Sequence, residues 1–308
     1  AQRDAVAAPS QNMLVLAGAG SGKTRVLVHR IAWLIRAEEY SPWSILAVTF
    51  TNKAAKEMEE RAAKLLHGNE GKGLLVCTFH SLGIRILREE HKHAGLKARF
   101  SILDATDTYG LVQQLYSTTD KQLIRKAQSV ISLWKNGLVD PDAALAQATT
   151  EEEGDIARLY KSYEATLAAY QAVDFDDLIL KPTRLLASNE EVRSRWQNRL
   201  RYLLVDEVQD TNACQYDLLR LIAGPRAMFT AVGDDDQSIY GWRGAEVGNI
   251  LRFEQDFPGA RIIRLERNYR STGRILAAAS GLIAHNEGRL GKTLWTEDGA
   301  GDKLSLRG

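Results

Sequence analysis

The stretch Ala17-Gly18-Ala19-Gly20-Ser21-Gly22-Lys23-Thr24 lies between a short apolar run at 13–16 and a helical pattern. The apolar run predicts a buried strand, and apolar residues recur at helical spacing between Val26 and Ile35. A glycine-rich turn between a strand and a helix is typical of a phosphate-binding loop, where backbone N–H groups converge on phosphate oxygens. In such a loop Lys23 reaches the outer phosphates and the Thr24 hydroxyl can bind Mg²⁺. We therefore expect nucleoside triphosphate binding here.

Position 17 departs from the generic pattern, which has glycine there, whereas this chain has Ala17. The alternative is a glycine-rich turn that binds no ligand. Because the strand and the helix that the motif requires both flank the loop, the nucleotide-binding interpretation is favoured.

The composition is that of an ordinary globular protein. The 308 residues are 44% hydrophobic and 26% charged, and the length suits about two domains. No apolar run approaches the length of a membrane span, and the first residues lack the apolar core of a signal peptide, so we expect a cytoplasmic protein without a membrane partner. Cys77 and Cys214 lie in separate apolar segments, which favours reduced core residues. The net charge of +1 gives no global argument for nucleic acid binding.

Further apolar runs predict the rest of a parallel sheet in an α/β fold. These runs lie at 45–49, 74–78, 202–205, 228–232 and 261–265. Parallel sheets bind their ligands at the carboxyl ends of the strands. Aromatic and hydroxyl side chains follow two of the runs directly, at 49–51 and 78–81. This repetition favours a surface on which bases stack and phosphates are held.

The run at 202–205 ends in Asp206 and Glu207, an arrangement in which a carboxylate reaches the Mg²⁺ of a phosphate loop. Asp206 would hold the metal through water, and Glu207 would orient and deprotonate the attacking water. The alternative is an acidic strand end that caps the next helix. The phosphate loop upstream and the Gln-Asp pair that follows favour the catalytic interpretation.

The loop 233–244 is too rich in functional side chains to be a mere connection. Gln237 can hydrogen-bond a terminal phosphate or the attacking water. Tyr240, Trp242 and Arg243 have the composition of a base-stacking platform.

Three consecutive acids, Asp234 to Asp236, could bind a metal, but acids on a loop are often only solvated. After the last strand, Tyr269 offers an aromatic ring for a nucleobase and Arg270 offers a cation for phosphate charge.

From about residue 85 the pattern becomes helical, which predicts a helical insert. The acids at 151–153 are expected in a solvated turn. A tyrosine stripe at 160, 163 and 170 could stack bases, but its helical spacing favours core packing. At 174–178 either Asp176 or Asp177 could cap the next helix, a metal site is the alternative, and Phe175 is expected to be exposed between acids.

Taken in order, these motifs resemble the UvrD/Rep/PcrA type of superfamily 1 DNA helicases, and within it the Rep branch. The resemblance covers the whole chain and rests on the phosphate loop, Thr-Phe-Thr-Asn-Lys-Ala-Ala at 49–55, Thr-Phe-His-Ser at 78–81, Asp-Glu-Val-Gln-Asp at 206–210, the loop 232–245 and Asn-Tyr-Arg-Ser at 268–271. Ala17 fits it, because these helicases use an alanine-first phosphate loop. The resemblance implies ATP and Mg²⁺ as cofactors and a RecA-like P-loop core.

The family's functional residues can be carried over to matching positions. Implied catalytic residues are Lys23, Asp206, Glu207, Gln237 and Arg270. The implied ATP site comprises Gln2, Ala17, Gly18, Ala19, Gly20, Ser21, Gly22, Lys23, Thr24, Arg25, Tyr269 and Arg270. The implied Mg²⁺ ligands are Thr24 and Asp206. The implied path of single-stranded DNA is lined by Phe50, Thr78, His80, Phe175, Tyr240, Trp242 and Arg243.

The resemblance also implies a division into domains. Residues 1–85 and 190–272 would form motor domain 1A, 86–189 a helical insert 1B, and 273–308 the start of a second motor domain 2A. Apolar residues between Ile275 and Ile283 predict a helix that lacks much of its partner, and 304–306 is a possible strand. We therefore expect a fragment of a longer protein. Val208 stands where the family usually has an aromatic residue, which could alter coupling to the loop 232–245.

The function expected from the resemblance is an ATP-dependent 3′ to 5′ DNA helicase that acts on single strands and on junctions with duplex, with replication-fork proteins as further partners. One alternative is a helicase subunit of a DNA-end-processing nuclease complex. Another is that this chain by itself is a non-catalytic module that binds nucleotide and DNA.

Overall fold

The computed structural model describes residues 1–305, and a parallel sheet of six strands lies at its centre. The strands are β1 (Met13–Ala17), β2 (Ile45–Thr49), β3 (Leu75–Thr78), β6 (Tyr202–Val205), β7 (Met228–Gly233) and β8 (Arg261–Leu265). Their order across the sheet is β3-β2-β6-β7-β1-β8, and every neighbouring pair is parallel. The predicted α/β fold with a parallel sheet is confirmed.

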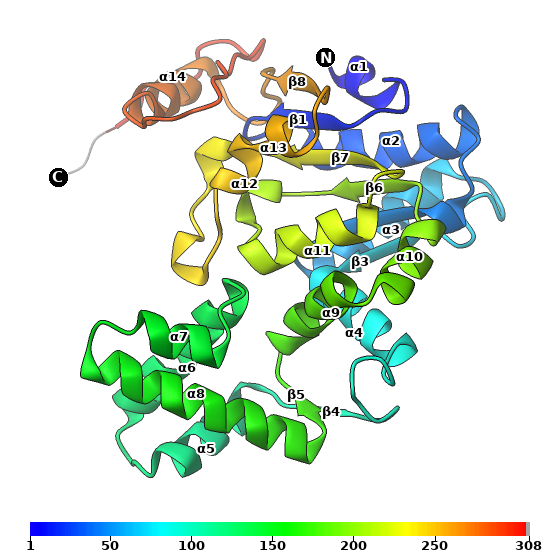
Figure 1. Ribbon diagram of the computed structural model, residues 1–308. Coiled ribbons are helices and arrows are strands. Elements are labelled where there is room, and N and C mark those ends of the chain that lie inside the picture. Colours follow the sequence, from blue (N-terminus) through cyan, green and yellow to red (C-terminus); the bar gives the residue numbers. More distant parts are fainter. Residues whose placement is uncertain (306–308) are drawn as a thin grey trace.

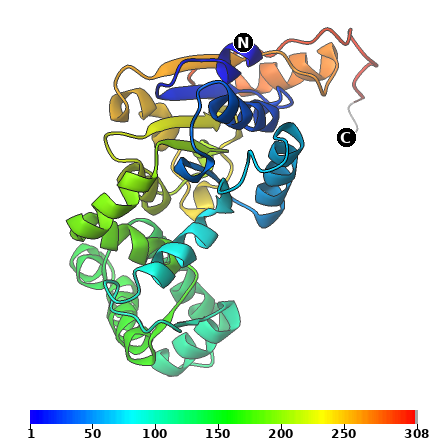
Figure 2. The same ribbon diagram turned by 90° about the vertical axis from the view of Figure 1, so that its right-hand side faces the viewer.

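Helices cover both faces of the sheet (Figures 1 and 2). Successive side chains of a strand point to opposite faces, so Met13 and Val15 of β1 belong to one core cluster and Leu14 and Leu16 to the other. The first cluster is closed by α1 (Gln2–Val6), α2 (Lys23–Arg36) and α3 (Asn52–Leu65). The second is closed by α4 (Phe79–Glu89), α9 (Asp177–Ser188), α10 (Glu190–Arg199), α11 (Ala213–Ala223), α12 (Gly248–Leu251) and α13 (Phe253–Asp256).

The predicted helical insert forms a separate body beside the sheet (Figure 1). It contains α5 (Ala105–Tyr116), α6 (Lys121–Asn136), α7 (Pro141–Gln147) and α8 (Glu151–Tyr170), which share one hydrophobic cluster. The chain enters through β4 (Ser101–Ile102) and leaves through β5 (Ala172–Val173). These two short strands pair in parallel, so the two connections lie side by side.

Two expectations for the insert need correction. The acids Glu151 to Glu153 are not a turn but the first turn of α8, where Glu153 and Thr150 form a capping box and the carboxylates meet the positive end of the helix dipole. Tyr160 and Tyr163 are buried as predicted, but Tyr170 is 62% exposed because it lies at the last position of the helix.

Helix α9 packs against the sheet rather than inside the insert. Its apolar residues Ile179, Leu180, Leu185 and Leu186 belong to the core cluster that contains β1 and β6. The division at 189/190 stays a prediction, and we propose that α9 be counted with the motor domain.

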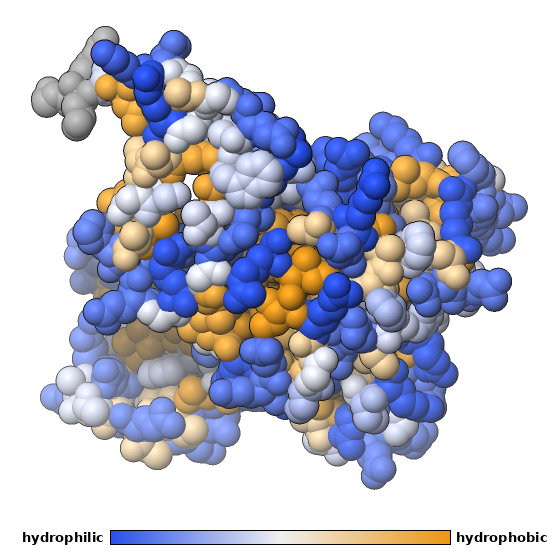
Figure 3. Space-filling model, turned by 90° about the horizontal axis from the view of Figure 1, so that it is seen from above, coloured by the Kyte–Doolittle hydropathy of each residue, from blue (hydrophilic) through white to orange (hydrophobic). Residues whose placement is uncertain are grey.

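The segment after the sheet begins with α14 (Gly273–Ile283), in agreement with the predicted helix. Leu276 is buried, whereas Ile275 is 46% and Leu282 is 76% exposed, so much of its apolar face is unpaired in residues 1–305. Figure 3, which looks down on the molecule from above, shows hydrophobic surface gathered near the centre of this face and bordered by hydrophilic side chains. Leu304 and Ser305 do not form the predicted strand, and Leu306 lies outside the described residues.

Within residues 1–305, no helix combines the length and the apolar character that a membrane crossing requires. Both cysteines are buried free thiols, as predicted.

A buried ionic cluster joins the insert to α9. Lys135 on α6 is fully buried, and its Nζ lies 2.6 Å from Glu164, 2.8 Å from Asp174 and 3.0 Å from Asp177. Burial lowers the pKa of Lys135, but attraction to the three carboxylates outweighs burial and raises this pKa well above its ordinary value. Asp176 stands at the predicted N-cap position of α9, but its side chain makes no capping hydrogen bond. The Asp177 backbone N–H donates to Asp174 Oδ1 at 2.8 Å, the Asp174 backbone N–H donates to Asp177 Oδ2 at 3.2 Å, and Asp177 also pairs with Lys135.

Two lysines of α6 provide a matched test of this cluster. Lys135→Met should lower the free energy of unfolding by about 3 to 5 kcal/mol, because it leaves buried carboxylates without a counter-charge. Lys126→Met, which removes an exposed pair with Glu152, should leave it nearly unchanged. Urea unfolding followed by circular dichroism measures both, and equal losses would contradict the assigned role of Lys135.

Candidate functional site

The loop between β1 and α2 has the backbone geometry of a phosphate-binding turn. Gly20 and Gly22 have φ values of +67° and +87°, in the left-handed region that glycine adopts at little cost. The Ser21 hydroxyl donates to the Gly18 carbonyl at 2.6 Å and closes the turn. Lys23 is then the first residue of α2, a 14-residue helix whose positive dipole end faces the loop. The predicted strand, loop and helix are confirmed.

Lys23 pairs with Glu207, which lies 184 residues away in the sequence. The Lys23 Nζ lies 3.1 Å from both Glu207 carboxylate oxygens. Glu207 has φ +50°, an uncommon value for a residue with a side chain and one that clusters at functional sites. The Gln209 side-chain N–H donates to Glu207 Oε2 at 2.7 Å. Glu207, the base that the sequence predicts, is therefore held by Lys23 and by Gln209.

The acidic end of β6 carries more negative charge than Lys23 balances. Burial, and then the charge of Glu207, raise the pKa of Asp206 to about 7. Burial and Glu207 also raise the pKa of Asp210 to about 6, and Asp210 Oδ1 is buried without a hydrogen-bond partner among the described residues. Thr24 and Asp206 line the same pocket and supply the oxygen ligands that Mg²⁺ prefers. The residues present therefore fit the predicted metal.

The loop that follows β7 is connected to this acidic strand end. The Asp234 backbone N–H donates to Gln209 Oε1 at 3.0 Å, and the Gln237 side-chain N–H donates to the Asp234 carboxylate. Val208 is fully buried, and its side chain lies next to Gly233 at the start of the loop. The position that departs from the family pattern is thus in contact with the loop to which we expected it to couple.

The acids of this loop are neutralised by side chains from near the C-terminal end. The Lys292 Nζ lies 2.5 to 2.7 Å from carboxylate oxygens of Asp234, Asp235 and Asp236. Arg289 adds a two-pronged contact to Asp236 at 2.6 and 2.7 Å. Lys292 and Arg289 thus provide the positive charge that a bound metal ion would provide to these three acids in the alternative interpretation.

The other predicted ATP residues surround the phosphate loop. The Gln2 side-chain N–H donates to the Ser21 carbonyl at 2.7 Å, and the Tyr269 backbone N–H donates to the Gly20 carbonyl at 2.9 Å. The Tyr269 ring is 52% exposed. Arg270 lies beside Gly20, and Arg25 is exposed on the first turn of α2.

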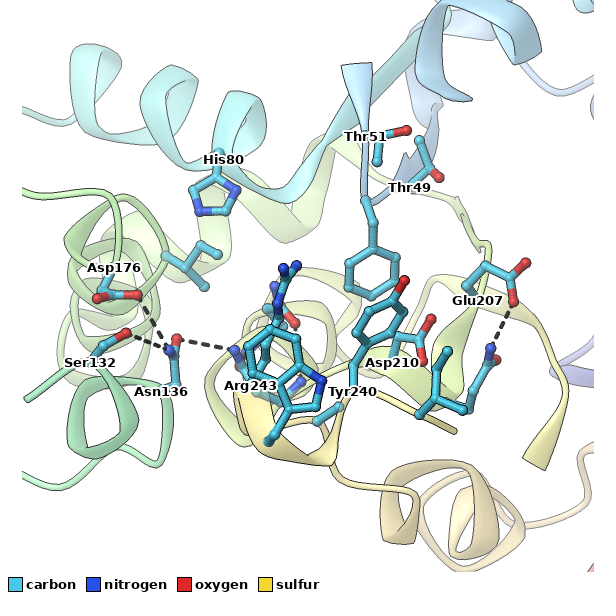
Figure 4. A pocket seen from close by; sticks show the side chains of 18 of the residues that line it. Thr49, Thr51, His80, Ser132, Asn136, Asp176, Glu207, Asp210, Tyr240 and Arg243 are labelled. Carbon is cyan, nitrogen blue, oxygen red and sulfur yellow. Dashed lines mark hydrogen bonds between the residues drawn. The ribbon is translucent and has the colours of Figure 1, made fainter. Parts of the chain in front are cut away.

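A pocket of about 1280 Å³ extends from the acidic strand end to the insert (Figure 4). Figure 4 shows Asn136 and Asp176 at one end, Glu207 at the other, and Tyr240 and Arg243 between them. Predicted nucleotide and DNA residues line it together, namely Thr24, Asp206, Glu207, Gln237, Phe50, His80, Tyr240, Trp242 and Arg243.

The predicted DNA residues differ in exposure. Trp242 is 70% exposed and Tyr240 39%, so neither is a core residue. The Arg243 guanidinium lies over both rings, 4.4 Å and 5.5 Å from their centroids. Phe175 is 50% exposed, as expected, and meets His80 edge to face at 6.4 Å. Thr78 is buried and caps α4.

Sequence reasoning missed the wall that α6 contributes to this pocket. Its polar side chains there are Arg125, Gln128, Ser129, Ser132 and Asn136. They recur at helical spacing opposite the buried Ile124, Ala127 and Ile131. The polar face of an amphipathic helix was the available signal, but it looks the same as an ordinary solvated face.

Comparison with known proteins gives the family. The family model described as "UvrD/REP helicase N-terminal domain" matches residues 1–258. The chain belongs to this UvrD/REP helicase family.

Relatives within the UvrD/REP family extend over the whole chain. It is 52% identical over 308 residues to "ATP-dependent DNA helicase Rep" of Escherichia coli, and the match covers 99% of this chain and 46% of that protein. It is 48% identical to "DNA helicase II" of Salmonella typhimurium, in a match that covers 99% of this chain and 43% of that protein. It is 44% identical to "ATP-dependent DNA helicase PcrA" of Leuconostoc citreum, in a match that covers 99% of this chain and 41% of that protein. The chain spans less than half the length of these relatives.

A titratable group in the pocket wall predicts a pH dependence of stability. Burial, and then the charge of Asp174, raise the pKa of Asp176 to about 6 although Ser132 and Asn136 donate hydrogen bonds to it. The folded protein therefore holds this proton more tightly than the unfolded chain does. The stabilising contribution is fully present below the ordinary pKa of 3.8 and is lost as the pH rises through about 6.

We expect Asp176→Asn to remove this loss. The quantity compared is the fall in the free energy of unfolding between pH 4 and 7.5. This fall should be smaller in the variant than in the unsubstituted chain, by on the order of 1 to 2 kcal/mol. Urea unfolding across this range provides the measurement. Parallel curves for the two proteins would show that Asp176 titrates normally.

Proposed function

We propose that this chain is the N-terminal motor half of an ATP-dependent DNA helicase that translocates 3′ to 5′ along single-stranded DNA and separates duplex at junctions. Residues 1–85 and 190–272 would form domain 1A, with α9 added to it, 86–189 the insert 1B, and 273–308 the beginning of domain 2A. The setting that we propose is replication or repair in the bacterial cytoplasm, with replication-fork proteins as partners. The bacterial relatives named as ATP-dependent DNA helicases support a role on DNA.

The observation that carries this proposal is the shared pocket. Its lining includes the predicted hydrolysis residues Asp206, Glu207 and Gln237 and the exposed aromatic residues Tyr240 and Trp242. The loop after β7 itself holds Gln237 and, a few residues later, the aromatic side chains. A strand of DNA bound to these rings would touch the same loop that faces the nucleotide. This arrangement suits an ATPase whose hydrolysis depends on DNA.

The Lys23–Glu207 pair suggests how nucleotide binding prepares hydrolysis. Phosphate oxygens would compete with Glu207 for the Lys23 ammonium, because an ammonium binds phosphate strongly. Glu207 would then be free to accept the proton of an attacking water, while Gln209 keeps its carboxylate in place. Bound Mg²⁺, held by Thr24 and Asp206, would neutralise phosphate charge. Gln237 and Arg270 would contact the terminal phosphate.

Single-stranded DNA would bind through its bases and its backbone. The exposed faces of Trp242, Tyr240 and Phe175 suit base stacking, and Arg243 and Arg125 suit phosphate. Stacking is tolerant of sequence because every base has a π face. We therefore expect binding without strong sequence preference.

ATPase rates with and without an oligonucleotide test the proposal. We expect strong stimulation by single-stranded DNA in a version extended to the native C-terminus and weak activity in this chain. In the extended version Lys23→Ala removes the phosphate contact and Glu207→Gln removes the base, and each should lower the DNA-stimulated rate by about 100-fold or more. DNA-independent turnover in the extended protein would contradict a helicase.

Two exposed tryptophans provide a test of the DNA surface. Trp242→Ala should weaken binding of a fluorescent oligothymidylate by about 1 to 3 kcal/mol, as loss of one stacking platform does. Trp43→Ala removes a ring that is 71% exposed at a site away from the pocket and should have no effect. Fluorescence anisotropy titrations compare the two. Equal affinity of both variants would argue against stacking on Trp242.

A further inference from the structure

The segment 289–295, which follows α14, runs along all three loops that form the candidate nucleotide site. Arg289 and Lys292 bind the acids of the loop after β7. Leu294 lies against Gly18 of the phosphate loop. The Trp295 N–H donates to the Glu266 carbonyl at 3.0 Å, just after β8. One short segment thus contacts the ends of β7, β1 and β8.

Lys292 makes the most concentrated of these contacts. It is 9% exposed, and its ammonium lies 2.5 Å from Asp234, 2.7 Å from Asp235 and 2.7 Å from Asp236. Three consecutive carboxylates on a tight turn repel one another, and a shared cation is needed to hold them together. The Leu290 backbone N–H donates to Asp235 Oδ2 at 2.8 Å and fixes the segment against the same turn.

Hydrogen bonds lead from this cation to the centre of the site in two directions. Asp234, which Lys292 holds, accepts from the Gln237 side chain. The Asp234 N–H donates to Gln209 Oε1 at 3.0 Å, and Gln209 donates to Glu207 Oε2 at 2.7 Å. Glu207 in turn pairs with Lys23. The path from Lys292 to Lys23 thus runs through Asp234, Gln209 and Glu207.

We propose that Lys292 is a positioning residue for nucleotide recognition: by holding Asp234 it sets the place of Gln237 and, through Gln209, that of Glu207. The proposal rests on the function proposed above. It assigns a role in recognition of the terminal phosphate to a lysine far from the phosphate loop in sequence. Because Lys292 follows α14, a movement of the segment 289–295 would change how the site distinguishes ATP from ADP.

Binding of fluorescent ADP and of a fluorescent non-hydrolysable ATP analogue, each with Mg²⁺, tests this in the chain itself. Lys292→Met should weaken binding of the ATP analogue about tenfold, as loss of one or two charge-assisted contacts does, and change ADP binding less than about twofold. Lys292→Arg keeps the charge and should restore most of the affinity. Lys303→Met, an exposed lysine beyond the segment, is the matched control.

A double substitution separates positioning from general support of the fold. In a Gln237→Ala background Lys292→Met should weaken binding of the ATP analogue much less than it does alone, because Gln237, the one of its two targets that is proposed to contact the terminal phosphate, is gone. Additive losses, or equal losses for ADP and the ATP analogue, would overturn the role of Lys292 and leave the proposed function intact. Failure of the unsubstituted chain to bind either nucleotide would overturn both.

Discussion

The ion pair between Lys23 and Glu207 is the interaction on which the candidate site depends. Placing the buried Asp206 beside the half-buried Glu207 and Asp210 at one strand end is costly, and Lys23 provides positive charge at that point. The pair can form because a parallel sheet brings all its carboxyl ends to one edge. The strand β7 lies between β6 and β1 in the sheet, so its loop is placed beside the pair without any long connection.

The exposed aromatic side chains can be explained by their position near the same edge of the sheet. Trp242 and Phe175 are large apolar groups left in water, which costs stability. The Arg243 guanidinium stacks on the Trp242 and Tyr240 rings, and this contact offsets part of the lost stability. Trp242 lines the pocket that also contains Glu207, and Phe175 lies against His80 of the same lining, which distinguishes both from scattered surface residues such as Trp43.

The sheet and the phosphate loop could be predicted from the sequence because their signals are local. Strands buried on both faces are continuous apolar runs, and the loop 17–24 is a contiguous motif. Lys135 and Lys292 could not be found in this way. Each is a single lysine without a local motif around it, and its partners lie 29 to 58 residues away, so only the folded chain shows that it is buried. The acids 151–153 were misjudged for a related reason, since a helix start and a solvated turn favour the same side chains.

The paired strands β4 and β5 constrain how the insert is attached to the rest of the molecule. Both covalent connections pass through one point, and the apolar residues Leu87, Leu96, Val173 and Leu178 pack around it. A body held at two adjacent points resists twisting about its long axis, since twisting would pull the strands apart. Lys135 of α6 adds a third attachment through its pair with Asp177 of α9. The insert is therefore fixed at points that do not lie on one line, and the polar face of α6 is held across the pocket from Trp242.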